Sequence, residues 1–325
     1  MKNSLKKYFL VCGTGSIGQR HIENLISLNE KIIIWRERKK KNLELKKRFP
    51  GIKYFENLNK AIKFCDAVII CNATNKHINI LKSAIKQKKH FYIEKPISNK
   101  IKDLNKINLN PKNIIGEVGY QFRSHPNLIF LKKKLRKSNS KIFSYRFAMG
   151  HNLKFWRKNH KFSKSYTNDV NKGGGALFEL IHQVDLAIWL FGPVKKITGY
   201  RSKVSSLKIK ADDLSNLILI HKSGIAGQIQ LDMISPLYRC EAEIVTDKEI
   251  LLWSYNEGKI TQKTQKRNKI IHKLTKSFKR NDLFINSMKH FVDRVYKKKK
   301  IPLCDLKEGA KSLIAINSIN KKLIN

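Results

Sequence analysis

Acidic side chains are in short supply in this 325-residue sequence: 24 Asp and Glu stand against 68 Lys and Arg, for a formal net charge of +44. Such a charge attracts nucleic acids and other polyanions. The basic residues are spread along the whole chain, however, and they accompany no nucleic-acid-binding motif. Since Asn and Ile are abundant too, we interpret the charge as compositional drift and expect no specific nucleic-acid partner. A polyanion-binding protein is the alternative.

Cysteine pairs and long apolar runs are also missing. The five cysteines are scattered without a CxxC pair, which argues against a metal cluster or a disulfide framework and suits a reducing cytosol. No stretch reaches the roughly 18–20 uncharged apolar residues of a membrane helix. The N-terminal lysines and the apolar residues 8–12 resemble a signal peptide, but the run is too short and no cleavage site follows. We therefore expect a cytoplasmic protein with no metal and no membrane partner.

The first clear motif is a glycine-rich turn at residues 13–18. It follows an apolar strand expected over residues 8–12 and precedes Ile22, Leu25 and Ile26, which recur at helical spacing. GxGxxG between a strand and a helix is typical of dinucleotide binding, because its glycines allow the turn, the approach of a pyrophosphate and close helix packing. The helix N-terminus adds N–H donors. We therefore expect cofactor contacts at Gly13, Gly15, Ser16, Ile17 and Gly18.

The choice of cofactor depends on the residues after the second expected strand, residues 31–35. A carboxylate there binds the ribose 2′-OH of NAD, whereas an arginine accepts the 2′-phosphate of NADP. Both are present, because Arg36 comes first and Arg38 flanks Glu37. The sequence favours NADP over NAD and leaves both open.

Polar residues follow the next buried strand as well. Residues 67–71 form a continuous apolar run, which is typical of a strand buried on both faces. Asn72 and Thr74 come next, where a loop passes over the cofactor. His77 opens the following helix, either as a cofactor contact or as a helix residue without chemistry.

A charged pair before a proline ends another short strand, expected over residues 91–93. Proline has a fixed φ and keeps the residue before it out of helical geometry, so Lys95 is extended at a strand end with Glu94 beside it. In open α/β sheets ligands bind at that end, and a lysine there can donate to a substrate hydroxyl or carbonyl. We expect Glu94 and Lys95 at the cofactor, with a surface Glu–Lys pair as the alternative.

Two sheets of different kinds are expected. Strands alternating with helices in the first half indicate a parallel, doubly wound α/β sheet. From residue 194 to residue 265 apolar and polar residues alternate, which indicates a mostly antiparallel open sheet with one face covered. Two helices are expected at 283–296 and 306–321. The predicted domains are residues 1–122, which bind the dinucleotide, and residues 123–325, an α+β domain for substrate binding and oligomerisation.

A single apolar helix is expected over residues 176–191, after a long irregular segment. Glu179, His182 and Asp185 are three apart in it, so neighbours in this set lie on adjacent turns of one side. Histidine is the usual proton-transfer group near neutral pH. The alternative is a core histidine paired with Asp185.

Four segments together resemble one family. They are residues 13–21 (GTGSIGQRH), Glu94-Lys95-Pro96, residues 119–126 (GYQFRSHP) and residues 173–185 (GGGALFELIHQVD). The chain resembles the family of glucose–fructose oxidoreductase and inositol dehydrogenase (Gfo/Idh/MocA) along nearly its whole length. The resemblance implies an N-terminal Rossmann domain and a C-terminal domain whose open sheet often mediates oligomerisation, hence a dimer or tetramer.

The resemblance also implies roles for particular residues. In the family, the lysine of the EKP motif and a histidine on the later helix perform the proton chemistry, and they match Lys95 and His182. Many members carry an aspartate four residues before that histidine, whereas here position 178 is Phe and the carboxylate is Glu179. The segment with Trp156 and Tyr166 resembles a branch found in surface-sugar and nonulosonate gene clusters.

These observations predict a cytoplasmic NAD(P)-dependent oxidoreductase acting on a secondary alcohol or ketone of a sugar, cyclitol or nucleotide sugar. In the oxidation direction His182 takes the hydroxyl proton, Lys95 stabilises charge on the oxygen, and Asp185 orients His182. Gln121 is expected at the cofactor. Substrate contacts are expected at Arg123, Trp156, Arg157 and Tyr166. A non-catalytic NAD(P)-binding sensor or scaffold is the alternative.

Overall fold

The computed structural model of the chain describes residues 6–37, 42–156, 166–297, 301–317 and 319. The chain forms two compact units. The first consists of Met1–Gln121 and Arg280–Gly309, and the second of Phe122–Lys279 and Ala310–Asn325. The first break lies next to the boundary expected at residue 122. The first unit also includes Arg280–Gly309, which the sequence-based division places in the second domain.

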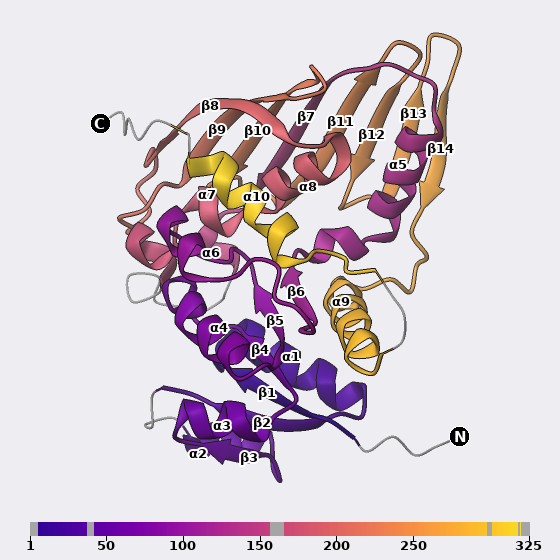
Figure 1. Ribbon diagram of the computed structural model, residues 1–325. Helices are drawn as coiled ribbons and strands as arrows, with labels where there is room; N and C mark the ends of the chain where they lie inside the picture. Colours follow the sequence, from indigo (N-terminus) through magenta and orange to yellow (C-terminus); the bar gives the residue numbers. More distant parts are fainter. Residues whose placement is uncertain (1–5, 38–41, 157–165, 298–300, 318, 320–325) are drawn as a thin grey trace. The chain divides into compact units, whose positions relative to one another are not determined.

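A parallel sheet of six strands forms the centre of the first unit (Figure 1). Its order is β3-β2-β1-β4-β5-β6. The order reverses beside β1, which is the place where doubly wound sheets bind ligands. The predicted parallel sheet is thus confirmed, with strands β1 (Tyr8–Cys12), β2 (Lys31–Trp35), β3 (Lys53–Phe55), β4 (Ala67–Ile70), β5 (His90–Glu94) and β6 (Gly116–Gly119).

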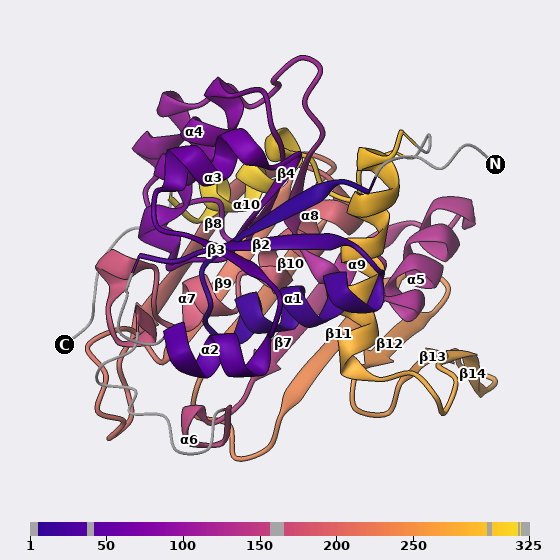
Figure 2. The ribbon, with the colours of Figure 1, turned by 90° about the horizontal axis from the view of Figure 1, so that it is seen from below.

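Helices cover both faces of this sheet. Apolar side chains of α1, α2 and α9 share one core cluster with β1, β2 and β4, and Figure 2 shows these helices on the same side of the strands. Helices α3 and α4 contact the strands through their own buried residues. The helices are α1 (Ser16–Ser27), α2 (Asn42–Arg48), α3 (Leu58–Phe64), α4 (His77–Lys86) and α9 (Arg280–Val295), with short 3₁₀ turns η2 (Thr74–Lys76) and η3 (Ile101–Lys106).

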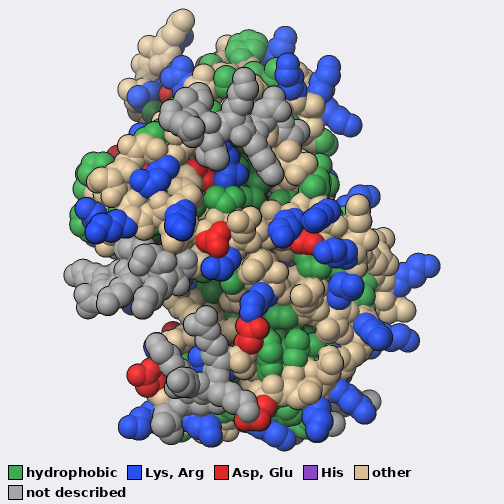
Figure 3. Space-filling model, turned by 90° about the vertical axis from the view of Figure 1, so that its left-hand side faces the viewer, with side chains coloured by type: hydrophobic (Ala, Val, Ile, Leu, Met, Phe, Trp, Pro, Cys, Tyr) green, Lys and Arg blue, Asp and Glu red, His purple; other side chains and the backbone are tan. Residues whose placement is uncertain are grey.

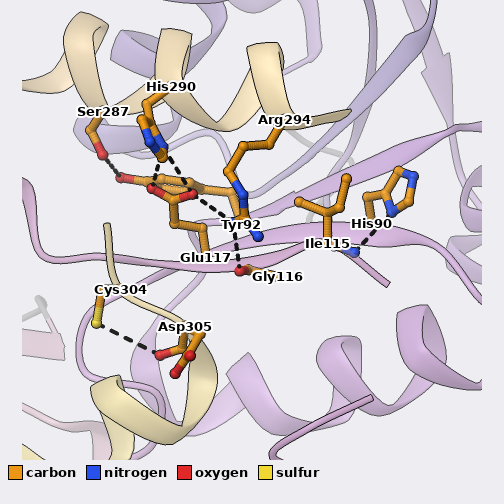
Figure 4. A network of polar contacts seen from close by, with 10 residues as sticks. All are labelled: His90, Tyr92, Ile115, Gly116, Glu117, Ser287, His290, Arg294, Cys304 and Asp305. Carbon is orange, nitrogen blue, oxygen red and sulfur yellow. Dashed lines mark hydrogen bonds and ion pairs between the residues drawn. The ribbon is translucent and has the colours of Figure 1, made fainter. Parts of the chain in front are cut away.

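Helix α9 joins the first unit by packing, although it comes late in the chain. Its Phe291 meets the rings of Phe9 and Tyr92 edge-on. Figure 4 shows the polar contacts beside this core, where the fully buried carboxylate of Glu117 accepts from Arg294 Nη1 at 3.0 Å and lies 3.2 Å from His290 Nδ1. A buried carboxylate is tolerated only when it is paired, so β6 depends on α9.

The second unit is built on an eight-stranded sheet in the order β14-β13-β12-β11-β7-β10-β9-β8. Among the described strands of this second sheet only β7 and β10 pair in parallel, so the expected mostly antiparallel sheet is confirmed. The strands are β7 (Ile142–Gly150), β8 (Val194–Ser202), β9 (Leu214–His221), β10 (Ala226–Asp232), β11 (Arg239–Thr246), β12 (Ile250–Ser254), β13 (Lys259–Lys263) and β14 (Asn268–Lys273).

The two faces of this sheet differ. In β11 the side chains of Cys240, Ala242 and Ile244 are buried, whereas Glu241 and Glu243 point to the opposite face. Helices lie along the buried face (Figure 1), and side chains of the other face, such as Ile218 and Tyr200, are exposed among the described residues. The helical segments of this unit are α5 (Pro126–Lys137), α6 (Leu153–Trp156), α7 (Ala176–Glu179), α8 (His182–Phe191), α10 (Leu306–Asn317), η4 (Gln121–Ser124), η6 (Tyr166–Asn168) and η7 (Val170–Lys172); η4 begins and α10 starts in the first unit.

The expectation of one helix over residues 176–191 is wrong. The helical stretch Val170–Glu179, which ends with α7, and helix α8 are bent by 57° relative to each other. Asp212 fixes the start of α7 by accepting from the N–H groups of Ala176 and Leu177 at 2.8 and 3.0 Å. Because α7 then packs on β9 and β10 while α8 packs on β7, the two segments follow different strands. Among the described residues no single helix could span a membrane, and α8 with the helical stretch before it passes that test only as a bent pair.

Lysine and arginine side chains are scattered over the face in Figure 3, between tan and green areas, with a few acidic groups among them. This distribution agrees with the spread of basic residues along the sequence.

Candidate functional site

The glycine turn lies between β1 and α1, and each glycine is needed for its own reason. Gly13 has a φ of +101°, and a Cβ there would lie 2.8 Å from the carbonyl oxygen of Cys71. A Cβ on Gly18 would lie 2.0 Å from the carbonyl oxygen of Gly13. A Cβ on Gly15 would meet nothing within 4 Å. Two glycines therefore serve chain packing, and the middle one faces open space.

The first turn of α1 borders that open space. Gly15 is the N-cap, with extended backbone and no side chain to bond the helix. The leading N–H groups of a helix have no partner within it, and here they begin at Ser16 and Ile17. This arrangement is the usual cradle for a phosphate, so the residues present fit the pyrophosphate of a dinucleotide.

Polar atoms at the ends of β2 and β3 are buried without partners. Arg36 Nη1 and the hydroxyl of Tyr54 have no hydrogen-bond partner among the described residues. Tyr54 pairs in register with Ile34, so Arg36 and Tyr54 lie on the same face of neighbouring strands. Glu37 is bound by the ammonium group of Lys76. Arg38, also expected here, lies outside the described residues.

The segment after β4 contributes Asn72, whose Oδ1 is buried and has no partner in the described part of the chain. Thr74 is buried at the start of η2. His77 is fully buried, with Nδ1 2.9 Å from the carbonyl of Pro96 and Nε2 3.0 Å from that of Asn72. Burial lowers the pKa of His77, and the two carbonyls only partly offset this. His77 thus fastens the segment after β4 to the segment after β5.

Lys95 follows β5 directly and is half-buried. The carboxylate of Glu94 beside it accepts from Nε2 of His21 at 2.7 Å, and both groups are buried. His21 belongs to α1. The pair therefore links the helix that begins at the glycine turn to the strand end that carries Lys95. The structure places the expected cofactor residues from Gly13 to Lys95, Arg38 apart, at the carboxyl ends of β1, β2, β4 and β5, and Gln121 follows β6.

In the second unit, Arg123 and Asp185 form a buried ion pair. Arg123 donates from Nε to Asp185 Oδ2 at 3.0 Å and from Nη2 to Oδ1 at 2.6 Å. Their side chains are 3% and 2% exposed. Arg123 was expected at the substrate and Asp185 at His182. The structure pairs these two groups, so each compensates the buried charge of the other.

His182 begins α8 and is 5% exposed. Its ring lies 5.3 Å from that of Phe122. Glu179 accepts from the hydroxyl of Thr167 at 2.7 Å and from that of Tyr166 at 3.2 Å. The structure thus brings Glu179 together with Tyr166, an expected substrate residue, on the far side of the helix break from His182. Arg157 lies outside the described residues.

A row of aromatic rings leads away from His182. Phe122 is followed by Tyr255, Tyr238, His151 and Trp156, with ring centroids 6.3, 5.6, 5.5 and 6.3 Å apart in that order. Of these, sequence reasoning singled out only Trp156. Tyr238 precedes β11 and Tyr255 follows β12, and these two strands pair antiparallel. Knowledge of that register would have predicted that the two rings meet.

Known proteins match both units. A model described as the NAD-binding Rossmann fold of the GFO/IDH/MocA oxidoreductase family matches residues 7–109, and the C-terminal domain model of this family matches residues 141–251. The chain belongs to this family. The expected oxidoreductase class and Rossmann domain are confirmed.

Relatives of this Gfo/Idh/MocA chain include enzymes of sugars and cyclitols. Myo-inositol 2-dehydrogenase of Thermotoga maritima is 27% identical over 230 residues, which are 67% of this chain and 66% of the relative. The WlbA dehydrogenase from Bordetella pertussis, in complex with NADH and UDP-GlcNAcA, has a TM-score of 0.78 at 18% identity and covers 96% and 94% of the two chains. A levoglucosan dehydrogenase in complex with NADH has a TM-score of 0.82 at 15% identity and covers 96% and 95%.

Proposed function

We propose that this chain is an NAD(P)-dependent dehydrogenase or reductase of a secondary alcohol or ketone in a sugar, cyclitol or nucleotide sugar. The observation that carries the proposal is the glycine turn, because its middle glycine faces open space beside the leading N–H groups of α1, which have no partner within the helix. Lys95 lies two strands along the same sheet edge. When bound, a nicotinamide nucleotide supplies the hydride acceptor or donor.

Cofactor contacts are assigned to the strand ends. The N–H groups of Ser16 and Ile17 hold the pyrophosphate, and the orphaned Oδ1 of Asn72 accepts from a donor group of the nucleotide. Gln121, at the end of the first unit, completes the expected set.

NADP is the proposed cofactor form. Arg36 Nη1 and the hydroxyl of Tyr54 are buried donors without partners in the described residues, and a 2′-phosphate offers them acceptor oxygens. Glu37, which would bind a ribose hydroxyl of NAD, is bound by Lys76 instead.

The proton chemistry is assigned to Lys95 of the first unit and His182 of the second. The His182 imidazole takes the hydroxyl proton in oxidation and returns it in reduction. The Lys95 ammonium group stabilises negative charge as it develops on the same oxygen. Asp185 orients His182, and Arg123 holds its carboxylate in place.

A sugar-type substrate is supported by the row of rings Tyr255, Tyr238 and His151 next to Phe122. Tyr238, Tyr255 and His151 are half-buried, and aromatic faces of this kind pack on apolar C–H groups. The relatives named above act on inositol or carry a sugar in their titles. The excess of positive charge favours an anionic substrate such as a nucleotide sugar.

A homo-oligomer is proposed through the open face of the eight-stranded sheet. Ile218 and Tyr200 on that face are 49% and 40% exposed, beside a hollow of about 980 Å³ lined by both basic and acidic side chains, among them Arg146 and Glu243. A face with both charge signs can meet a second copy of itself. Light scattering should show a dimer or tetramer that Ile218→Lys dissociates; an unchanged mass would remove this face from the interface.

The reaction is tested by screening nucleotide sugars, sugar acids and cyclitols for a change in nicotinamide absorbance, with NADP and NAD in parallel. We expect turnover with at least one substrate of these classes. Tight cofactor binding without turnover of any of them would favour the sensor or scaffold instead.

A further inference from the structure

The turn η4 holds the helix of His182 at two points. Phe122 packs its ring 5.3 Å from that of His182. The next residue, Arg123, binds both carboxylate oxygens of Asp185. His182 and Asp185 are three residues apart on α8, so they lie on adjacent turns of the same side of this helix. Phe122 and Arg123 of η4 thus hold two successive turns of α8.

The ion pair is a specific contact because it is fully desolvated. Both side chains are almost inaccessible to water, and a buried charge that loses its partner is strongly destabilising. The guanidinium group matches the carboxylate in a bidentate geometry that fixes orientation as well as distance, which the compact ammonium group of lysine cannot do. The position of α8 therefore depends on Arg123 in particular.

We propose that Arg123 and Asp185 are positioning residues for His182, and that Phe122 backs its ring. This inference rests on the proposed function, in which the His182 imidazole moves the substrate proton. Arg123 then binds no substrate, and its effect on the reaction passes through Asp185 and the first turns of α8. Because a proton-transfer group must lie within hydrogen-bond reach of its target, a small displacement of α8 lowers the rate of the chemical step.

Arg123→Lys keeps the charge and loses the bidentate fork, and Asp185→Asn keeps the shape and loses the charge. In both variants we expect kcat, with the substrate found in the absorbance screen, to fall by about tenfold or more. KM should stay within about twofold, because neither residue touches substrate. The double variant should be little worse than the worse single variant, since the two residues act as one unit.

Hydrogen exchange gives a measurement that needs no turnover. Amides of α8 should exchange at least about tenfold faster in Arg123→Lys and in Asp185→Asn than in the parent, while the Kd of NADPH measured by calorimetry stays unchanged. Asp185→Asn also serves if Arg123→Lys fails to fold.

The matched control is Arg294→Lys, which alters the buried ion pair with Glu117 in the first unit. It should speed exchange in α9 and leave kcat and α8 exchange at the parental level. Parental kcat and parental α8 exchange in both Arg123→Lys and Asp185→Asn would overturn the proposal, and so would a selective rise in KM, which would return Arg123 to the substrate. His182→Ala tests the proposed function separately: parental turnover in that variant removes the catalytic role of His182, while the exchange data still decide whether η4 holds α8.

Discussion

The candidate sites of the two units consist of different kinds of chemical group. In the first unit, the candidate residues lie at the carboxyl ends of parallel strands. The expected phosphate contacts come from backbone groups, namely the turn at Gly15 and the N–H groups of α1. In the second, the site consists of side chains on a broken helix, held by buried pairs such as Arg123 with Asp185. We infer that substitutions in the first unit act on cofactor binding, by filling the space beside the turn or by removing a phosphate contact. Substitutions in the second unit act by displacing a side chain of the site.

The largest effect is expected at Lys95 of the first unit. Lys95→Ala removes a charge that acts as negative charge develops on the substrate oxygen, so kcat should fall by about 10²–10⁴-fold. The Kd of NADPH, from calorimetry, should change little. Near-parental turnover would show that the first unit contributes cofactor binding alone.

The second unit should lose stability in acid through His125, the N-cap of α5. Its Nδ1 accepts from the N–H of Asn127 at 3.2 Å. Burial, helped by the nearby His272, lowers the pKa of His125 to about 4. The unfolded chain binds this proton near pH 6.5 and the native chain does not until about pH 4, so stability should fall as pH falls through this window, by on the order of 3 kcal/mol.

His125→Asn keeps an N-cap acceptor and removes the titration. Urea unfolding between pH 7 and pH 4 should show a smaller loss of stability for this variant than for the parent. Parallel pH curves for the two proteins would exclude His125 as the cause.

Gly15→Val separates space from stability in the first unit. Because a Cβ there meets nothing within 4 Å and φ is −69°, the melting temperature should be unchanged. The side chain should block the approach of the phosphate and so weaken the binding of NADPH by about 100-fold. Gly18→Ala is the contrasting variant, since its Cβ strikes backbone, and it should lower the melting temperature. A Gly15→Val protein that binds NADPH as the parent does would refute the Rossmann cradle.

The smallest effect concerns the choice of cofactor. Arg36→Ala should weaken the binding of NADPH by about tenfold, because a charge-assisted contact to the 2′-phosphate is lost. The affinity for NADH should stay nearly unchanged. Calorimetry with both nucleotides measures the two affinities. Lys76→Ala, which releases Glu37, should strengthen the binding of NADH. Equal losses for both nucleotides in Arg36→Ala would place Arg36 away from the phosphate.

The sequence predicted what is local. The glycine turn, the buried strand at 67–71 and the alternation after residue 194 each carry their signal within a few residues, so both sheets were predicted correctly. The break between α7 and α8 was missed because the apolar pattern runs through it, while the strands that α7 and α8 pack on, and Asp212 at the start of α7, lie more than thirty residues away in the chain. The helix predicted at 283–296 was likewise expected without the sheet that it covers.

In the candidate site, too, the features with a local sequence signal were predicted and the contacts between distant residues were not. The placement of Lys95 at a strand end followed from the proline after it, and the structure has it there. The partner of Asp185 did not follow, because His182 is near in sequence whereas Arg123 is 62 residues away. Pairing between distant charged side chains depends on the packing of η4 against α8, which no periodicity records.

The return of residues 280–309 to the first unit has a consequence for synthesis on the ribosome. All six parallel strands have been made by residue 119, but the helix that covers Phe9 and Tyr92 and neutralises Glu117 emerges only after residues 122–279. At about 5–20 residues per second, the nascent first unit exposes an apolar face and an uncompensated carboxylate for about 10–30 seconds. This interval is an opening for a chaperone, and a fragment ending at residue 121 would keep that face exposed.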